Sequence, residues 1–148
     1  GRVINTSSTS GIYGNVGQTN YGAAKAAIAA FTIIAARELG RLGVTVNAIS
    51  PSAYTRMTDY LREYTEEEIE TRDPRWVSPT VVYLASEEAG DITGRVIQAG
   101  AGMVAVCEGW RRGAEVDQVA DPSELGPLIR EMCEKARKNS GMDGMELD

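Results

Sequence analysis

The chain has 148 residues, enough for one domain of ordinary size. It carries 15 Lys and Arg against 21 Asp and Glu, and the resulting net charge of −6 argues against a general nucleic-acid binder or a membrane-surface binder. The sequence contains no His and only two Cys, which excludes imidazole catalysis, Cys-rich zinc sites and disulfide frameworks, and favours a reduced, cytoplasmic setting.

The first 50 residues predict a strand, a long helix and a second strand. A β-branched run over residues 2–6 is typical of a strand. An Ala-rich segment then predicts a helix from about Asn20 to Leu42. Its longest apolar stretch, residues 26–36, is too short to span a membrane. The β-branched segment 44–49 predicts the second strand, which Pro51 is expected to stop.

The more acidic remainder predicts further helices and strands. Apolar residues at helical spacing, such as Leu61 and Tyr64, indicate a helix over about 56–70. Asp73 and Ser78 each resemble an N-cap that is followed by Pro at the first position of a helix. The other expected elements are a strand over 93–99 and a last helix that follows Pro127, and residues 103–107 could form a further short strand. Residues 121–124 resemble a capping box.

The order of these elements indicates the fold class. Two strands joined by a long helix indicate a parallel crossover connection, which is right-handed in nearly all proteins. We therefore expect an α/β fold in which helices cover a parallel sheet. Three strands are few for such a sheet, because it is normally buried on both faces. Since the chain also opens with Gly1 instead of Met, we expect that its N-terminal half is missing.

Three residues of the first helix and strand could form a catalytic group. Tyr21 and Lys25 are four residues apart on the long helix and therefore share one face. An ammonium group near a phenol favours the phenolate, so Tyr21 is a plausible general acid or base. Ser8 follows the first strand, at the end where open α/β sheets bind ligands. Together these groups could polarise a carbonyl and deliver a proton while a hydride arrives from elsewhere.

A Tyr and a Lys at this spacing also occur on ordinary helix surfaces, where the Lys side chain merely extends past the ring. The surrounding sequence favours the functional interpretation. Residues 5–8 and 17–25, with the glycines between them, closely resemble the short-chain dehydrogenase/reductase family, in which a Ser-x12-Tyr-x3-Lys arrangement follows the fifth strand. The resemblance continues through residues 44–51 and 84–94 and covers about 100 residues.

This resemblance implies the C-terminal part of a Rossmann-like, doubly wound parallel sheet, with strands five to seven and their covering helices. Tyr21 would be the catalytic acid/base. Lys25 would lower the pKa of Tyr21 and bind the ribose hydroxyls of the nicotinamide cofactor, NAD or NADP. Ser8 would orient the substrate carbonyl. The implied activity is transfer of a hydride between the cofactor and a carbonyl/secondary-alcohol pair.

The stretch after the second strand would line the nicotinamide. By resemblance, the cofactor-binding residues there are Pro51, Ser52, Tyr54 and Thr55. Thr55 is the candidate for the contact with the carboxamide. Family members often have Pro-Gly where this chain has Pro51-Ser52, and the loop before Thr55 looks one residue shorter. A strand stop at Pro51 and a helix N-cap at Thr55 remain the alternative explanations.

One subgroup of the family resembles this chain more than others do: the (3R)-hydroxyacyl-CoA dehydrogenase part of multifunctional β-oxidation enzymes and its stand-alone bacterial relatives. The segments that carry this resemblance are 51–58, 73–79 and 108–112. It implies a 3-hydroxyacyl or 3-oxoacyl thioester as substrate. Gln18 and Asn20 could touch substrate, although turn hydrogen bonds explain them as well. Arg111 and Arg112 could meet acidic groups of a CoA substrate or lie on a solvated surface.

No Gly-rich phosphate turn follows a strand in the sequence, so the chain would hold the catalytic half of the family's domain and lack most of the cofactor-binding half. This partial domain would cover residues 1–138, with a C-terminal extension from about 103 and a flexible tail over 139–148. The full-length enzyme is expected to be a homodimer or homotetramer without a metal. The alternatives are a truncated, non-catalytic binding or oligomerisation module and a reductase for another carbonyl, such as a steroid or a 3-oxoacyl-carrier-protein.

Overall fold

The computed structural model describes residues 1–59 and 62–147, and it divides the chain into two units. The first unit, Gly1–Glu108, holds the sheet, and the second is Gly109–Asp148. No helix within the described residues is long and apolar enough to cross a membrane. The expectation of one domain to residue 138 with a flexible tail after it stays a prediction.

A four-stranded sheet in the order β1-β2-β3-β4 forms the centre of the first unit. Its strands are β1 (Arg2–Thr6), β2 (Thr45–Ser52), β3 (Val96–Gly100) and β4 (Met103–Cys107). The first three strands run parallel, and β4 runs antiparallel to β3. The predicted parallel connection and the α/β class are confirmed, and the short strand that follows β3 becomes an antiparallel neighbour.

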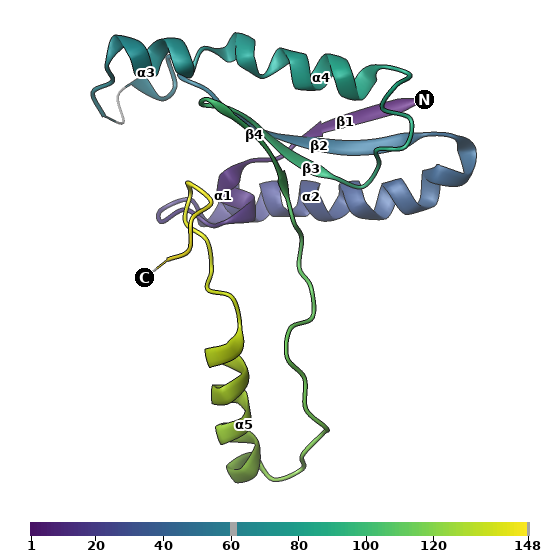
Figure 1. Ribbon diagram of the computed structural model, residues 1–148, viewed down its shortest axis with the longest axis vertical. Helices are drawn as coiled ribbons and strands as arrows, with labels where there is room; N and C mark the ends of the chain where they lie inside the picture. The colour runs from purple at the N-terminus through teal and green to yellow at the C-terminus, as the bar shows by residue number, and fades with distance from the viewer. Residues whose placement is uncertain (60–61, 148) are drawn as a thin grey trace. The chain divides into compact units, whose positions relative to one another are not determined.

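Helices lie on both faces of this sheet, as Figure 1 shows. The helix α2 (Thr19–Leu39) lies on one face, and α3 (Glu66–Thr71) and α4 (Ser78–Ala85) lie on the other. The shorter elements are α1 (Thr9–Ile12) and the 3-10 helices η1 (Gly40–Leu42) and η3 (Pro74–Trp76). The arrangement is that of a doubly wound sheet.

The core follows from the alternation of side chains along β2. Val46 packs with two alanines of α2 on one face, whereas Ile49 packs with Leu84 of α4 and Ile97 of β3 on the other. A central strand between two helical layers is covered on both faces, and β2 is accordingly buried from residue 45 to residue 50. Its buried residues include polar Thr45, Asn47 and Ser50 as well as apolar ones. The two layers hold the carboxyl ends of β1 and β2 side by side.

The prediction that Pro51 stops β2 is wrong, because the strand runs on to Ser52. In a strand, every second residue directs its backbone N–H and C=O toward the same neighbouring strand. The Ile49 carbonyl oxygen accepts from the Ser7 N–H at 2.8 Å, so the backbone groups of Ile49 face β1. The backbone nitrogen of Pro51, two residues further along, faces β1 as well. Since β1 ends at Thr6, opposite Ile49, the N–H that Pro51 lacks would have no partner strand to meet.

The helix predicted over 56–70 is shorter in the structure, where α3 begins only at Glu66. Thr65 and Glu68 form a reciprocal capping box, in which each side chain accepts from the backbone N–H of the other. This cap fixes the start of the helix. Leu61, one of the residues that indicated the longer helix, lies outside the described residues.

The prediction that Ser78 caps the helix containing Pro79 is also wrong. Ser78 is the first residue of α4, and Val77 precedes it with helical backbone angles and no side-chain cap. The reason is the 3-10 turn η3, which leads into α4 with one residue between them. The corresponding prediction for Asp73 is confirmed, because its side chain caps η3 and accepts from the N–H of Arg75 at 2.8 Å.

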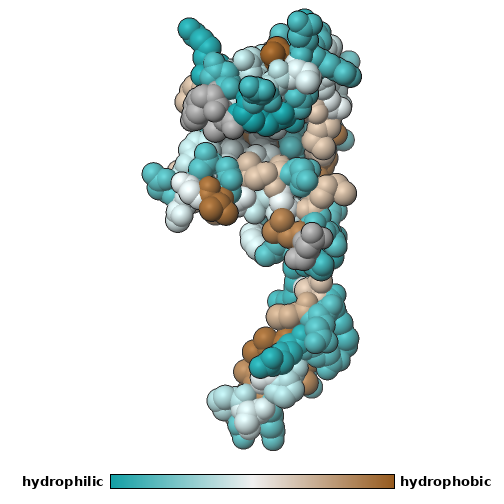
Figure 2. Space-filling model, turned by 90° about the vertical axis from the view of Figure 1, so that its left-hand side faces the viewer, coloured by the Kyte–Doolittle hydropathy of each residue, from teal (hydrophilic) through white to brown (hydrophobic). Residues whose placement is uncertain are grey.

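The second unit contains α5 (Pro122–Lys135), so the prediction that this helix begins after Pro127 is wrong. Asp121 accepts from the Ser123 N–H at 2.8 Å, and Pro122 takes the first helical position, which sets the earlier start. Figure 2 shows hydrophobic side chains gathered along one side of this helix, beside hydrophilic ones. Residues Ser140 and Glu146 form an antiparallel bridge after it.

Candidate active site

Ser8 lies at the carboxyl end of β1, directly before the short helix α1. Its backbone is extended, with φ −162° and ψ 151°, and its side-chain oxygen accepts a hydrogen bond from the Ser10 N–H at 3.2 Å. Ser8 is therefore the N-cap of α1. A hydroxyl that accepts one hydrogen bond still has its own proton to donate, so Ser8 can donate to the oxygen of a substrate carbonyl.

Lys25 connects the end of β1 to Tyr21. Its ammonium group donates to the Thr6 carbonyl oxygen at 2.9 Å and lies 5.7 Å from the centroid of the Tyr21 ring. Both side chains come from one face of α2, as their spacing predicts. Tyr21 is 44% exposed, so a ligand at the carboxyl end of β1 can reach its ring. The structure thus brings Tyr21 and Lys25 together at the end of the strand that Ser8 follows.

Two glycines allow α1 to pack closely against α2 at this site. A Cβ atom on Gly11 would lie 2.6 Å from the backbone of Lys25, and one on Gly22 would lie 2.9 Å from the Ser10 carbonyl oxygen. The Ser7 hydroxyl adds a hydrogen bond to the Lys25 carbonyl oxygen at 2.8 Å. This close approach holds the capping serine next to the turn of α2 that carries the lysine.

The predicted cofactor-binding residues begin at the carboxyl end of β2, next to the carboxyl end of β1. Pro51 and Ser52 end β2, which pairs directly with β1. Tyr54 follows, and its N–H donates to a backbone carbonyl at the end of α3 at 2.7 Å. The Thr55 hydroxyl accepts from the N–H two residues further along at 3.2 Å, which makes it the cap of a turn. A local role therefore accounts for Thr55, and its contact with a cofactor stays a prediction.

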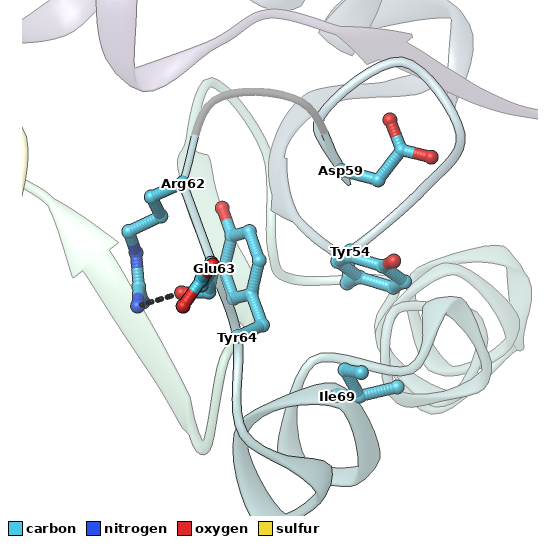
Figure 3. Close-up of a pocket in the computed structure, with 6 residues that line it drawn as sticks. All are labelled: Tyr54, Asp59, Arg62, Glu63, Tyr64 and Ile69. Atoms are coloured by element: carbon cyan, nitrogen blue, oxygen red, sulfur yellow. Dashed lines mark hydrogen bonds between the residues drawn. The ribbon is translucent and has the colours of Figure 1, made fainter.

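An open cavity of about 500 Å³ follows the end of β2 (Figure 3). Its lining residues are Tyr54, Asp59, Arg62, Glu63, Tyr64 and Ile69. The rings of Tyr54 and Tyr64 meet edge to face with centroids 5.1 Å apart, and the Arg62 guanidinium lies 4.1 Å from the Tyr64 centroid. Arg62 also pairs with Glu68 at 2.6 Å, and its hydrogen bond lowers the pKa of that carboxyl to about 2. The cavity therefore combines an aromatic wall with a cation that already has a partner.

Gln18, the other predicted substrate contact, takes part in local hydrogen bonds. Its side-chain carbonyl oxygen accepts from the Ser10 hydroxyl at 2.7 Å and from the Asn15 amide at 3.1 Å. These bonds support the turn explanation, and a contact with substrate stays a prediction. In the second unit Arg112 pairs with Glu115 at 3.2 Å. Within the described ranges, no group of three or more His, Cys, Asp or Glu side chains could hold a metal ion.

The fold and the site define a class of protein: a doubly wound α/β domain with a Ser directly after its first parallel strand and a Lys that binds the end of that strand and lies beside a Tyr. The family model described as Enoyl-(Acyl carrier protein) reductase matches residues 1–104. The chain belongs to the short-chain dehydrogenase/reductase family. The resemblance predicted from the motifs is therefore confirmed.

Individual relatives agree with this assignment. The peroxisomal hydratase-dehydrogenase-epimerase of Saccharomyces cerevisiae is 41% identical over 134 residues, which cover 84% of this chain and 15% of that protein. The 3-oxoacyl-[acyl-carrier-protein] reductase FabG of Vibrio harveyi is 44% identical over 114 residues, 72% of this chain and 47% of that protein. The (3R)-3-hydroxyacyl-CoA dehydrogenase of Mus musculus is 39% identical over 111 residues, 70% of this chain and 43% of that protein.

A solved structure shows the same fold. The crystal structure of a short chain dehydrogenase from Mycobacterium avium matches with a TM-score of 0.79 and 47% identity, covering 94% of this chain and 45% of that one. This match confirms the predicted fold class. The chain spans less than half the length of each of these four relatives.

Proposed function

We propose that the full-length protein is an oxidoreductase that transfers a hydride between NAD or NADP and a 3-hydroxyacyl or 3-oxoacyl thioester. The observation that carries the proposal is the Lys25 ammonium group, which contacts the Thr6 carbonyl oxygen and lies near the Tyr21 ring. Ser8 caps α1 two residues after Thr6, at the same strand end. A phenol and a hydroxyl at one site can together act on a carbonyl oxygen, which is the chemistry of a dehydrogenase or reductase.

The residues present fit the nicotinamide-ribose end of such a cofactor. Lys25 has three N–H donors, and Thr6 takes one of them, which leaves two for ribose hydroxyls. Pro51 and Ser52 lie at the end of the neighbouring strand, where they can line the nicotinamide ring. When bound, the cofactor supplies or accepts the hydride. We assign its pyrophosphate to none of the described residues, because the sequence has no Gly-rich turn between a strand and a helix.

Each of the three polar residues has its own part in the reaction. Tyr21 donates its hydroxyl proton to the substrate oxygen during reduction and takes a proton from the alcohol during oxidation. Ser8 donates a hydrogen bond to the same oxygen and so holds the carbonyl in place. The Lys25 ammonium group, fixed by its bond to Thr6, places positive charge near the phenol, where negative charge develops as the proton leaves.

An acyl thioester is supported by the relatives and by the cavity. Two relatives are named for a 3-hydroxyacyl-CoA and a 3-oxoacyl-[acyl-carrier-protein] substrate. In this chain a cavity of about 500 Å³ is lined by Tyr54, which also belongs to the predicted cofactor stretch. The Tyr54 and Tyr64 rings and the Ile69 side chain offer apolar surface against which an acyl chain can pack.

We also propose that the full-length protein is a homodimer or homotetramer. On α2 the apolar side chains Phe31 and Ile34, one turn apart, are 57% and 56% exposed. Large apolar side chains exposed together on one helix are typical of an interaction surface. A cytoplasmic location, predicted from sparse cysteine, stays a prediction.

A substrate panel on the full-length protein tests the proposed activity. Oxidation or formation of NADH and NADPH is followed by absorbance with a 3-oxoacyl-CoA, a 3-oxoacyl-carrier-protein, a steroid ketone and the corresponding alcohols. We expect turnover with at least one of the thioesters and weaker turnover with the steroid. Turnover of the steroid alone would overturn the thioester assignment, and no turnover of any substrate would favour a non-catalytic module.

A further inference from the structure

Tyr13 lies directly after α1, at the opposite end of that helix from Ser8. Its N–H donates to the Thr9 carbonyl oxygen at 2.8 Å, so Tyr13 closes the single turn that Ser8 opens. Its hydroxyl reaches the sheet, where it donates to the side-chain oxygen of Gln98 on β3 at 3.4 Å and lies 3.5 Å from the sulfur of Cys107 on β4. Tyr13 therefore joins the α1 turn to two strands that follow it by more than 80 residues.

The surroundings of the Tyr13 hydroxyl keep it protonated. Gln98 is 5% exposed, and Cys107 is half-buried. Burial, with a smaller contribution from Cys107, raises the pKa of Tyr13 to about 12. The phenol is therefore neutral in the range in which a dehydrogenase works, and it acts as a fixed hydrogen-bonding group instead of a proton donor to substrate.

The α1 turn is held from two directions. On the α2 side, Gly11 and Gly22 allow backbone contact with Lys25 and Ser10. On the sheet side, the Tyr13 hydroxyl contacts β3 and β4. Since the turn is only four residues long, a displacement at its end moves its beginning as well. Its beginning is the cap formed by Ser8.

We propose that Tyr13 is a positioning residue: its hydroxyl, held by Gln98 and Cys107, fixes the α1 turn and so orients the Ser8 hydroxyl toward the substrate carbonyl. The proposal rests on the proposed function, in which Ser8 binds the substrate oxygen. Both contacts of the Tyr13 hydroxyl are long, so together they should contribute about as much free energy as one ordinary hydrogen bond between neutral groups. We expect its loss to change rates by about 2- to 10-fold.

Tyr13→Phe in the full-length protein tests the proposal, because it keeps the ring and removes only the hydroxyl. We expect kcat with a 3-oxoacyl thioester to fall by about 2- to 10-fold while the KM for the nicotinamide cofactor is unchanged. Tyr83→Phe is the matched control, because Tyr83 is 47% exposed on α4, and it should leave kcat unchanged. A Tyr13→Phe enzyme with wild-type kcat would overturn the proposal.

A double variant separates positioning through Ser8 from a general structural effect. If Tyr13 acts through Ser8, the Ser8→Ala/Tyr13→Phe enzyme should be no slower than Ser8→Ala alone. If the losses of kcat caused by the two changes simply multiply in the double variant, Tyr13 does not act through Ser8, and this result would overturn the proposal. Thermal unfolding of each variant checks that it folds.

Hydrogen exchange provides a readout that does not depend on activity. The Ser10 N–H donates to the Ser8 side chain, and the Gly11 N–H donates to the Ser8 carbonyl oxygen at 2.9 Å. Both amides should exchange about 2- to 10-fold faster in Tyr13→Phe than in the wild type, because the turn is held less firmly. Unchanged exchange would overturn the positioning proposal, whereas a wild-type protein that reduces no thioester would instead overturn the proposed function.

Discussion

Replacing Gly11 by Ala perturbs the contact that brings the two parts of the site together. The added Cβ atom would lie 2.6 Å from the backbone of Lys25 and Ala26, whereas ordinary van der Waals contact begins at 3.4 Å. The α1 and α2 backbones would therefore have to separate by roughly 0.8 Å. That separation moves the capping Ser8 away from the α2 turn that carries Lys25.

The size of the effect follows from two opposing contributions. Overpacking of this kind costs about 1–3 kcal/mol, whereas replacing a helical Gly by Ala gains up to about 1 kcal/mol. We expect Gly11→Ala to lower the free energy of unfolding by about 1–2 kcal/mol. Turnover should fall as well, because the Ser8 hydroxyl and the Lys25 ammonium group are displaced relative to each other.

Urea unfolding of the full-length wild type and variant measures the change in stability. Gly40→Ala is the matched control, since Gly40 also has helical backbone angles, φ −54° and ψ −39°, but an added Cβ there meets nothing within 4 Å. The control should be neutral or stabilised by up to about 1 kcal/mol. If Gly11→Ala is as stable as Gly40→Ala, the packing argument is refuted.

Two further predictions concern charged groups. The hydrogen bond from Arg62 lowers the pKa of Glu68 from 4.5 to about 2, so its stabilising contribution is present above pH 4.5 and is lost as the pH falls toward 2. An NMR titration of the Glu68 carboxyl should show this low pKa, and a value near 4.5 would contradict the pairing. Lys25→Met should weaken NADH or NADPH binding as well as turnover, because it removes both the bond to Thr6 and the proposed ribose donors. A cofactor dissociation constant equal to that of the wild type would contradict the proposed role of Lys25 in binding the ribose of the cofactor.

Local sequence patterns were sufficient to predict the parts of the site that depend on short spacings. A spacing of four residues places Tyr21 and Lys25 on one face of any α-helix. The β-branched run before Ser8 forms a strand, so the serine had to lie at a strand end. The family motif adds the roles of these residues, which their positions alone do not specify.

Contacts between distant segments could not be predicted in this way. The local sequence around Gly11 and Gly22 does not reveal that another backbone passes within contact distance of each glycine. The link from Tyr13 to Gln98 and Cys107 joins residues that only the folded sheet brings together. Likewise, β2 tolerates Pro51 because β1 ends early, which is a property of the neighbouring strand.

The central claim is that Tyr21 transfers the proton in a reaction on an acyl thioester. The most direct measurement compares kcat of full-length wild type and Tyr21→Phe with a 3-oxoacyl thioester and NADH or NADPH, together with the cofactor dissociation constant of each protein. We predict that kcat falls by about 10²- to 10⁴-fold while cofactor binding is largely retained, because only the hydroxyl is lost. Turnover by Tyr21→Phe comparable to that of the wild type would contradict the claim.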